Sequence, residues 1–488
     1  MSRSTLAART DGDAEFAAQR VVTLRLFSGH FHRLALLALA EAAIIVVSFF
    51  GAIHLRFAGF SSTLSAFEAT VGAIWPRALM MAALFLLSLA ALGLYQLRQR
   101  AGFRGVLVRL LLAVLLAEAI LAFVFYAAPP LFIGRGVTIL TGAIAFFALA
   151  VTRYTFVRAV DEDVFKRRVL VWGAGARAAT IRKRLRRRSD QRGFRIVGYV
   201  RAPGDRGEVP EGMILSSDGD VVRLALRLKV EEIVVAMDDR RAGFPAAELL
   251  DCRLRGMHVS ELLTFLERES GRVAVELMHP SWLIFSNGFR CDRLRLASKR
   301  LFDVVVSLGI LVVASPVALL AALAVYLEDR KPVLYRQLRT GQNGRPFEML
   351  KFRSMRVDAE SDGQAVWASR NDPRATRVGA LIRRLRIDEL PQVFNVLLGH
   401  MSFVGPRPER PEFAAQLGRE IPFYPERHFV KPGITGWAQV RYSYGASLRD
   451  AREKLEYDLY YVKHHSLAFD LMVLVQTVEI VLFRVGAR

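Results

Sequence analysis

Four long apolar runs interrupt the polar pattern in the first third of the chain. They lie near Leu34–Leu55, Ala73–Leu94, Val106–Tyr126 and Leu131–Val151. Each is close to the ~20 residues that cross a bilayer as a helix, so the pattern predicts a transmembrane domain of four spanning helices over residues 1–160. Glu41 and Glu118 interrupt two of the runs, and a single acid facing the interior of a helix bundle is more often structural than catalytic.

Positive charge lies on one side of these runs. Basic residues precede the first run, join the second run to the third and follow the fourth: Arg20, Arg25 and Arg33; Arg98, Arg100, Arg104 and Arg109; and Arg153, Arg158, Lys166, Arg167 and Arg168. The positive-inside rule therefore predicts that the N-terminus and everything after the fourth run face the cytoplasm.

After the fourth run the pattern changes to short apolar strands alternating with helices, with strands at RVLVWG, RIVGYV and VEEIVVAM. This alternation predicts a Rossmann-like α/β domain over residues 166–290. Gly173, Gly175 and Ala178 follow the first strand as GxGxxA, a spacing that can bring backbone amides close to a pyrophosphate. The acid expected about 20 residues later to hold a ribose is missing, and Arg201 ends the second strand. We therefore favour a tight turn and helix packing as the role of the glycines, with a bound nucleotide as the alternative.

A fifth apolar run, residues 300–327, is long enough to span a bilayer, yet Ser315 and Pro316 lie at its middle. Positive residues flank both ends, with Lys299 before the run and Arg330 after it. Proline removes a helical hydrogen bond and bends a helix. A re-entrant helix, which enters one leaflet and returns, therefore satisfies the charges and keeps the rest of the chain in the cytoplasm. A kinked spanning helix is the alternative.

The last apolar run, Ser466–Val485, carries polar residues seven positions apart, at Asp470, Thr477 and Arg484. This spacing places the three residues on one face of a helix. Such a stripe suits a helix lying in the plane of the membrane surface, and it suits equally a helix buried against a folded domain.

Two adjacent carboxylates, Asp388 and Glu389, lie among arginines that include Arg383 and Arg407. Phosphate chemistry uses this mixture, because a carboxylate can act as a nucleophile or hold a divalent cation, and guanidinium groups bind phosphoryl oxygens. We expect the arginines to lower the carboxylate pKa values and to keep the nucleophile ionised. A solvated helix face is the alternative, although Pro391 ends a helix just past the acids.

Three motifs along the C-terminal part of the chain carry a resemblance to a known family. They are KFRSM at 351–355, LIRRLRIDELPQVFNVLLGHMSFVGPRP at 381–408 and KPGITGWAQV at 431–440. Residues 297–488 thereby resemble the α/β-type catalytic domain of the monotopic phosphoglycosyl transferases, whose long members carry a similar middle domain. The resemblance implies transfer of a sugar 1-phosphate from a UDP-sugar to undecaprenyl phosphate through a covalent aspartyl phosphosugar, which starts exopolysaccharide synthesis. It also implies Mg²⁺ as cofactor, a re-entrant helix, and a bacterial inner-membrane protein with a cytoplasmic catalytic domain.

The resemblance assigns roles to individual residues. Asp388 matches the nucleophile and would also hold the metal, while Glu389 would orient the metal or assist proton transfer. Phosphate and nucleotide binding falls to four basic residues: Lys351, Arg353, Arg383 and Arg407. Lys299, Arg300 and Asp303 match the start of the broken helix of the family, which would lie near the polyprenyl phosphate headgroup. We expect Asp303 to pair with a neighbouring arginine.

The segment GWAQVRYSYGAS departs from the commonest pattern of this family, in which Asn-Gly follows the valine. The motifs therefore do not predict which sugar is transferred. Trp437 and the nearby tyrosines can stack on a uracil or a sugar, or pack in the core.

Composition narrows the partners and the rival functions. The chain has a net charge of +22 and is 53% hydrophobic, which favours membrane lipid as a partner, and no nucleic-acid-binding signature accompanies the charge. A membrane-anchored nucleotide-sugar dehydratase would need a Tyr-x-x-x-Lys pair, and the sequence contains none. A non-catalytic scaffold of a polysaccharide synthesis complex is a further alternative, and we expect a homodimer.

Overall fold

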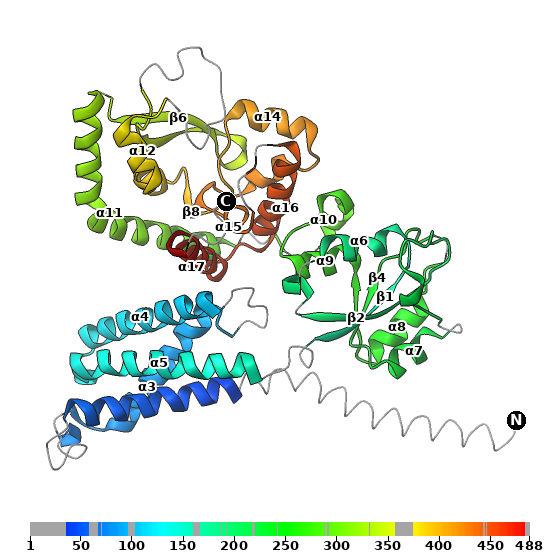
Figure 1. Cartoon of the computed structure of the whole chain (residues 1–488), viewed down its shortest axis with the longest axis horizontal. Helices are drawn as coiled ribbons and strands as arrows, with labels where there is room; N and C mark the ends of the chain where they lie inside the picture. The colour runs from blue at the N-terminus through cyan, green and yellow to red at the C-terminus, as the bar shows by residue number, and fades with distance from the viewer. Residues whose placement is uncertain are drawn as a thin grey trace, which may run out of the picture. The chain divides into compact units, whose positions relative to one another are not determined.

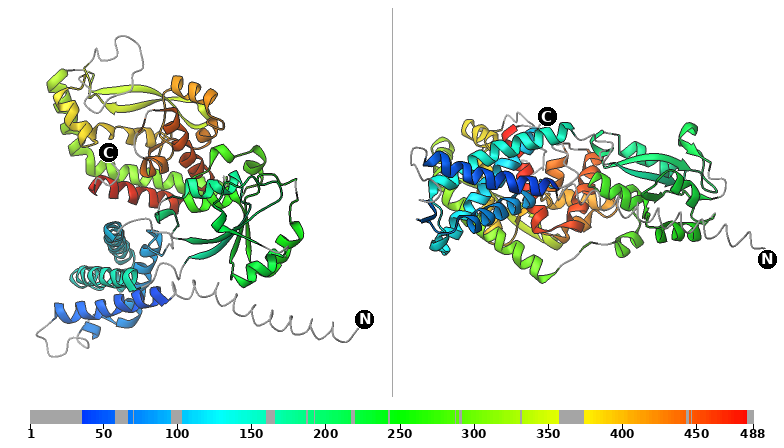
Figure 2. Two further views of the ribbon diagram at one scale, coloured as in Figure 1. Left: turned by 45° about the vertical axis from the view of Figure 1, so that its right-hand side comes forward. Right: turned by 90° about the horizontal axis from the view of Figure 1, so that it is seen from below.

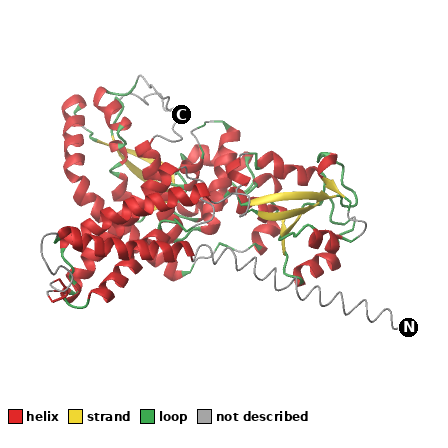
Figure 3. Cartoon of the chain, turned by 60° about the horizontal axis from the view of Figure 1, so that its bottom comes forward, coloured by secondary structure: helices red, strands yellow, loops and turns green. Residues whose placement is uncertain are grey.

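The computed structural model describes residues 36–57, 67–69, 71–95, 103–159, 166–186, 188–191, 193–216, 220–241, 243–286, 288–289, 292–330, 332–356, 374–442, 445 and 447–483. The chain forms two compact units, Met1–Ser270 and Gly271–Arg488 (Figure 1, Figure 2). Helices dominate, and the described strands form one five-stranded sheet and two small two-stranded ones (Figure 3).

Apolar helices long enough to cross a bilayer fill the first part of the N-terminal unit. In the described residues they are Leu36–Arg56, α3 (Ile74–Ala91), the stretch Gly105–Ala127 of α4 (Phe103–Ala127) and the stretch Arg135–Thr155 of α5 (Arg135–Ala159). Glu41 is fully buried and pairs with Arg153 of α5 at 2.8 Å, and the Tyr95 hydroxyl donates a hydrogen bond to it. Glu41 therefore joins two helices, which is the structural role predicted for it.

A five-stranded parallel sheet follows in the same unit (Figure 1). Its strands are β1 (Arg167–Trp172), β2 (Phe194–Val200), β3 (Ile214–Leu215), β4 (Glu232–Val235) and β5 (His258–Glu261), in the order β3-β2-β1-β4-β5. Helices α7 (Val221–Arg227) and α8 (Ala246–Leu254) cover one face, and α6 (Ala176–Arg184) and α9 (Leu262–Ser270) cover the other. Val169, Leu170 and Val171 of β1 are fully buried, as a strand covered on both faces requires. The predicted parallel α/β domain is confirmed.

The glycine turn after β1 is closed by the protein's own carboxylates. Gly173 has a φ of +125°, and a Cβ there would lie 2.5 Å from the carbonyl oxygen of Ala236. Asp238 accepts hydrogen bonds from the first two backbone N–H groups of α6, at 3.0 and 2.8 Å. Asp205 accepts from the N–H of Ala174 at 2.7 Å. The positive φ and the close approach at Gly173 confirm the predicted tight turn. The amides that would meet a pyrophosphate are already bonded, which counts against the alternative of a bound nucleotide.

The C-terminal unit begins at Gly271, earlier than the expected start at residue 297. The ring N–H of Trp437 donates to the carbonyl of Gly271 at 2.7 Å. The N–H of Val273 donates to the carbonyl of Glu456 at 3.0 Å. These bonds attach the segment after the sheet to C-terminal helices more than 160 positions away, a distance over which local sequence pattern carries no signal.

The C-terminal unit packs helices around two small sheets. An antiparallel hairpin joins β6 (Leu334–Thr340) to β7 (Pro346–Phe352), and β8 (Ser402–Val404) pairs in parallel with β9 (Gly433–Thr435). The helices are η5 (Val275–Leu277), α10 (Pro280–Phe285), α11 (Arg293–Asp329), η6 (Gln342–Gly344), α12 (Arg377–Arg384), η7 (Ile387–Glu389), α13 (Gln392–Leu397), α14 (Pro411–Glu420), η8 (Pro425–Phe429), α15 (Trp437–Arg441), α16 (Leu448–His464) and α17 (Leu467–Phe483). Their shared core includes Met349, Val396, Phe403, Trp437 and Tyr461.

Helix α11 carries Pro316 near mid-length, and Figure 1 shows the helix bent into two arms. Proline has no N–H for the carbonyl four residues earlier, and the Ser315 hydroxyl donates to that carbonyl, of Val312, at 3.1 Å. The first arm packs with α13, β8 and α17, and the second packs with α12 and β7. Around the bend, apolar side chains are 67–80% exposed: Val312, Val313, Leu319 and Leu320. Both arms therefore rest on the same unit while the bend presents an apolar surface.

Candidate active site

A short turn between α12 and α13 holds Asp388 and Glu389. Arg386 takes a left-handed conformation, with φ 61° and ψ 17°, just after α12 ends. Residues Ile387–Glu389 form η7, and Pro391 directly precedes α13, where its fixed φ suits the start of a helix. The rigid backbone on both sides places the acids at the interior of the unit, where Asp388 is 9% exposed.

Glu389 is held by two arginines. Its Oε1 lies 3.3 Å from Nη2 of Arg407 and 3.5 Å from Nη1 of Arg386. Burial raises the pKa of Glu389, but Arg407, Lys351 and Arg386 outweigh burial and hold the pKa below its usual 4.5. The prediction of a lowered carboxylate pKa is therefore confirmed for Glu389.

Asp388 has a different environment from its neighbour. Its Oδ1 is buried and accepts no hydrogen bond from any residue that the structure describes. Burial and the adjacent charge of Glu389 raise the pKa of Asp388 above its usual 3.8, although Lys351, Arg386 and Arg383 act against this rise. The expectation that arginines lower its pKa is wrong, because burial outweighs cations that lie nearby without bonding to it.

Lys351 joins the cluster from β7, where it lies opposite Tyr335 of β6. Burial and the charge of Arg407 lower the pKa of Lys351 to about 8, against the opposing effects of Glu389 and Asp388. The fold thus brings five predicted residues into one electrostatic cluster: Lys351, Arg383, Asp388, Glu389 and Arg407. Arg386, which the sequence did not assign to the site, also acts on both acids.

Three other predicted residues bond to backbone or side-chain groups elsewhere in the unit. Nη2 of Arg353 donates to the carbonyl of Asp329 at 2.7 Å, at the end of α11. Arg300 donates to a carbonyl near the end of α13 at 2.6 Å. Lys299 pairs with Asp470 at 2.5 Å. These contacts anchor α11 to its neighbours, and phosphate binding by the three residues stays a prediction.

Two polar residues of α17, Asp470 and Thr477, contact the interior of the unit. Asp470 is 1% exposed, and Oγ1 of Thr477 lies 2.8 Å from Oγ1 of Thr435 in β9. At these two positions the structure supports the second alternative for the last apolar run, a helix buried against a folded domain. Arg484, the third residue of the predicted stripe, lies outside the described residues.

Asp303 joins α11 to β8. It accepts hydrogen bonds from Oγ of Ser402 at 3.1 Å and from the N–H of Phe403 at 3.2 Å. The prediction that Asp303 pairs with an arginine is wrong for these contacts, because its partners here are a serine hydroxyl and a backbone N–H. In β8, residues 402 and 404 pair with residues of β9. The N–H of Phe403, which lies between them, donates to the buried carboxylate of Asp303 instead, so this buried donor has a hydrogen-bond partner.

Two buried features that the sequence did not single out support the site. Nη2 of Arg427 donates to the carbonyl of Arg407 at 3.0 Å and pairs with Asp458 at 2.7 Å. Asn395 accepts a hydrogen bond from the N–H of the residue before Lys351 at 2.9 Å. Arg427 bonds to a segment 20 positions away and Asn395 to a segment 45 positions away. No local sequence pattern therefore predicts either contact.

Comparisons with known proteins agree with this architecture. Residues 294–484 match the family described as "Bacterial sugar transferase", and residues 90–242 match a family described as "CoA-binding domain". The UDP-N-acetylgalactosamine-undecaprenyl-phosphate N-acetylgalactosaminephosphotransferase of Aeromonas hydrophila is 41% identical over 251 residues, which cover 51% of this chain and 58% of that protein. The UDP-glucose:undecaprenyl-phosphate glucose-1-phosphate transferase of Escherichia coli (strain K12) is 37% identical over 300 residues, covering 59% of this chain and 61% of that protein. An exopolysaccharide production protein of Rhizobium leguminosarum bv. phaseoli is 44% identical over 188 residues, covering 38% of this chain and 94% of that protein.

The chain belongs to the bacterial sugar transferase family. Its match with the Rhizobium protein takes in almost the whole of that relative, and the family match contains all eight predicted site residues. With the longer Aeromonas protein the match spans 58% of the relative. The apolar helices make the chain a membrane protein.

The turn after β1 does not fit a cofactor phosphate. A pyrophosphate at this position of a parallel α/β fold would need the amides at the start of α6, and Asp238 already accepts hydrogen bonds from them. Asp205 adds a second carboxylate at the same turn, and two negative charges there repel a phosphate. We therefore assign no cofactor to the turn after β1.

Proposed function

We propose that the protein transfers a sugar 1-phosphate from a UDP-sugar to undecaprenyl phosphate and so starts assembly of an exopolysaccharide. The observation that carries this proposal is the buried Oδ1 of Asp388, unbonded among the described residues, beside a Glu389 that Arg407 already holds. The names of the Aeromonas and Escherichia relatives specify undecaprenyl phosphate as acceptor and N-acetylgalactosamine or glucose as the sugar. These names support the donor and acceptor classes.

Asp388 is the proposed nucleophile. One carboxylate oxygen attacks the β-phosphorus of the UDP-sugar, the bond from that phosphorus to the bridging oxygen breaks, and UMP leaves with the electron pair. The sugar phosphate is then held on Asp388 as an acyl phosphate. An oxygen of the lipid phosphate attacks the same phosphorus, releases the carboxylate and forms the lipid-linked sugar diphosphate. Two steps allow a cytosolic donor and a membrane-embedded acceptor to use one position in turn.

The basic residues would stabilise the charge that develops during transfer. Guanidinium groups bind phosphoryl oxygens through paired donors, and cations fixed in a partly buried site need little reorganisation when the charge appears. Lys351, Arg383 and Arg407 would take this role. In the sequence, Lys351 and Arg383 precede the two acids and Arg407 follows them. The ion pair at 3.3 Å between Arg407 and Glu389 would keep the guanidinium oriented.

Magnesium fits the acidic pair as the cofactor. Mg²⁺ prefers oxygen ligands and commonly binds through one or two carboxylates together with substrate phosphates and waters. The Oδ1 of Asp388 is a buried oxygen without a described hydrogen-bond partner, so Asp388 would hold the metal with Glu389 beside it. When bound, Mg²⁺ would lower the repulsion between the carboxylate and the diphosphate.

The proposed location is the bacterial inner membrane, with four spanning helices and the C-terminal unit on the cytoplasmic face. We propose that α11 is re-entrant, because both arms pack on one unit and the exposed bend is apolar. Hydrocarbon cannot satisfy a free carbonyl, and Ser315 donates to the one that Pro316 leaves. Some of the basic residues behind the predicted orientation lie outside the described residues: Arg20, Arg25, Arg33, Arg98 and Arg100.

Replacing Pro316 by leucine is expected to straighten α11 and to turn part of the population into a spanning form. Proline costs ~3 kcal/mol in a helix interior, so its removal favours the straight helix by a factor on the order of 100. Protease added outside spheroplasts should then cleave a C-terminal tag that is protected in the wild type. Ala314→Leu, two positions earlier, is the matched control and should stay protected. A tag exposed on the outside in the wild type contradicts the re-entrant helix.

The rate of transfer is expected to follow a bell-shaped pH profile. Asp388 must be ionised, so the rate falls as pH drops through its raised pKa. Lys351 must be protonated to offset phosphoryl charge, so the rate falls as pH rises through about 8. Arginine in place of Lys351 keeps its charge at higher pH and should move the alkaline limb upwards. Initial rates of UMP release between about pH 5 and 10 test this, and an alkaline limb that does not move excludes Lys351 as its origin.

The proposed function is tested with purified full-length protein, Mg²⁺, undecaprenyl phosphate and separate UDP-sugars, with UMP release as the readout. Release that depends on the lipid phosphate supports the transferase, and release with one sugar identifies the donor. If the protein releases no UMP with any of the sugars, the transferase proposal fails and the non-catalytic scaffold takes its place.

A further inference from the structure

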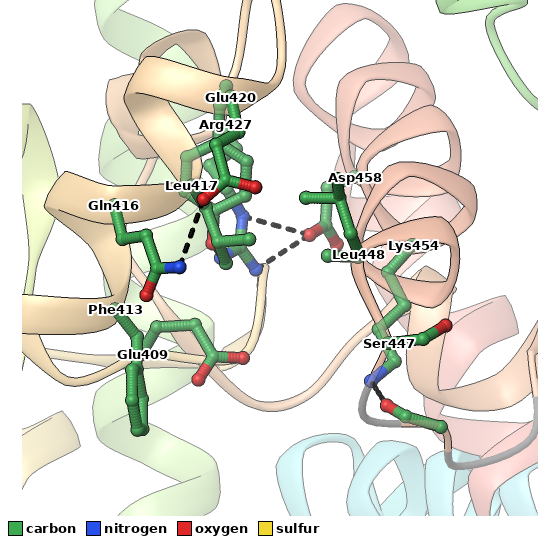
Figure 4. A pocket seen from close by; sticks show the side chains of 13 residues that line it. Glu409, Phe413, Gln416, Leu417, Glu420, Arg427, Ser447, Leu448, Lys454 and Asp458 are labelled. Atoms are coloured by element: carbon green, nitrogen blue, oxygen red, sulfur yellow. Dashed lines mark hydrogen bonds and ion pairs between the residues drawn. The ribbon is translucent and has the colours of Figure 1, made fainter. Parts of the chain in front are cut away.

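A cavity of about 170 Å³ lies between α14 and α16 in the C-terminal unit. Figure 4 shows Gln416, Leu417 and Glu420 of α14 facing Leu448 and Asp458 of α16 across it. A single bound water needs only ~10–15 Å³ of such volume. The cavity is therefore large enough for a chemical group rather than a solvent molecule alone.

The walls of the cavity combine apolar surface with hydrogen-bonding groups. Phe413 and Leu448 line it with carbon, whereas Glu409, Glu420 and Lys454 contribute charged groups. A sugar ring has the same two properties, because its C–H face is apolar and its rim carries hydroxyls that donate to carboxylates. Acidic residues outnumber basic ones in the lining, which disfavours a phosphate in this cavity.

The cavity adjoins the proposed reaction centre through two connections. Arg407, which pairs with Glu389, and Glu409, which lines the cavity, lie two residues apart in the segment after β8. Two extended residues span about 7 Å. Arg427 lines the cavity and donates to the carbonyl of Arg407 at 3.0 Å. A substrate with its phosphates at Arg407 would therefore have an adjoining group within reach of the cavity.

We propose that this cavity binds a neutral, hydroxyl-bearing ring of the nucleotide-sugar donor. The proposal rests on the proposed transferase function and names the part of the enzyme that recognises the ring. Gly445 and Ser447 also line the cavity, ahead of and at the N-terminus of α16. The ring is the transferred sugar or the ribose of the nucleotide, which share this chemistry.

The test compares cavity variants with a matched control in the full-length protein. Glu420→Ala removes an acceptor from the cavity wall, and Ala451→Leu fills part of the cavity from α16. Glu412→Ala removes an exposed glutamate from the same helix α14, outside the cavity lining. Alanine and leucine are the best helix formers, so the three variants are expected to fold, and a thermal unfolding curve checks this.

Calorimetry with UDP-sugar and with UDP gives the decisive result. Glu420→Ala should bind the UDP-sugar about tenfold more weakly, as expected for a lost hydrogen bond to a charged group. Ala451→Leu should also bind it more weakly, because the leucine occupies volume that the ring needs, while Glu412→Ala binds as the wild type does. Unchanged affinity for UDP then identifies the sugar as the occupant, and an equal loss for UDP identifies the ribose. Wild-type affinity of both cavity variants for both ligands overturns the proposal.

UMP release, measured in parallel, separates this proposal from the proposed function. A wild-type protein that binds the UDP-sugar through the cavity but releases no UMP contradicts the transferase and leaves the cavity as a binding site. A protein that releases UMP with unchanged kcat/KM in Glu420→Ala and Ala451→Leu remains a transferase whose cavity does not bind the ring.

Discussion

An Asp388→Asn variant is expected to lose sugar-1-phosphate transfer by a factor of about 10⁴ or more. Asparagine has nearly the same shape as aspartate, so the packing of this buried position is kept, but its amide cannot form the acyl phosphate. UMP release measures the loss. Intact-protein mass spectrometry after mixing with donor alone measures the cause, because the wild type should gain one sugar phosphate and the variant should gain none.

Two further variants control this experiment. Glu412→Gln removes an exposed carboxylate of α14 and should keep the wild-type rate. Glu389→Gln removes the negative partner of Arg407 at 3.3 Å while leaving Asp388 in place, so the rate should fall less and the adduct should still form. A sugar-phosphate adduct on the Asp388→Asn protein contradicts the covalent mechanism.

Arg427→Met is expected to destabilise the C-terminal unit by about 3–5 kcal/mol. Arg427 and Asp458 are 6% and 2% exposed and form an ion pair at 2.7 Å, so methionine leaves a carboxylate buried without its partner. The same change removes the hydrogen bond to the carbonyl of Arg407, and transfer should slow as Arg407 loses its support. Thermal unfolding in detergent and kcat for UMP release measure the two effects.

An exposed ion pair in the same unit is the matched control. Arg336 and Glu348 lie 3.3 Å apart and are 68% and 61% exposed, so Arg336→Met should change stability by only ~0–1 kcal/mol. The double variant Arg427→Met, Asp458→Leu removes both buried charges and should recover much of the stability lost in the single variant. Equal melting temperatures for Arg427→Met and Arg336→Met would show that the buried pair does not stabilise the unit.

The predicted chemistry of the acidic pair was correct for one member and wrong for the other. Both acids lie beside arginines in the sequence, which favours lowered pKa values for both. In the folded chain Arg407 bonds to Glu389, whereas Oδ1 of Asp388 is buried with no described partner, and the pKa of Asp388 is raised. Sequence proximity therefore predicts which charges are near and does not predict which of them make contact.

The same limit applies to Lys299 and Asp303 at the start of α11. The motif marks both residues as candidates for the site, but Lys299 pairs with Asp470, 171 positions later. Asp303 bonds to β8, about 100 positions later. These contacts form because α11, β8 and α17 pack together, and no pattern within a few residues of either side chain contains that information.

Apolar run length was enough to predict the membrane helices, and strand–helix alternation was enough to predict the parallel sheet, because both depend on neighbours within one element. Motif spacing likewise indicated five charged residues that the fold brings together, and their roles in catalysis stay a prediction. The burial of Asp388, the support of Arg407 by Arg427 and the cavity between α14 and α16 required the folded chain. Burial and ion pairing depend on atoms that are close in space but far apart in sequence, so only tertiary packing decides them.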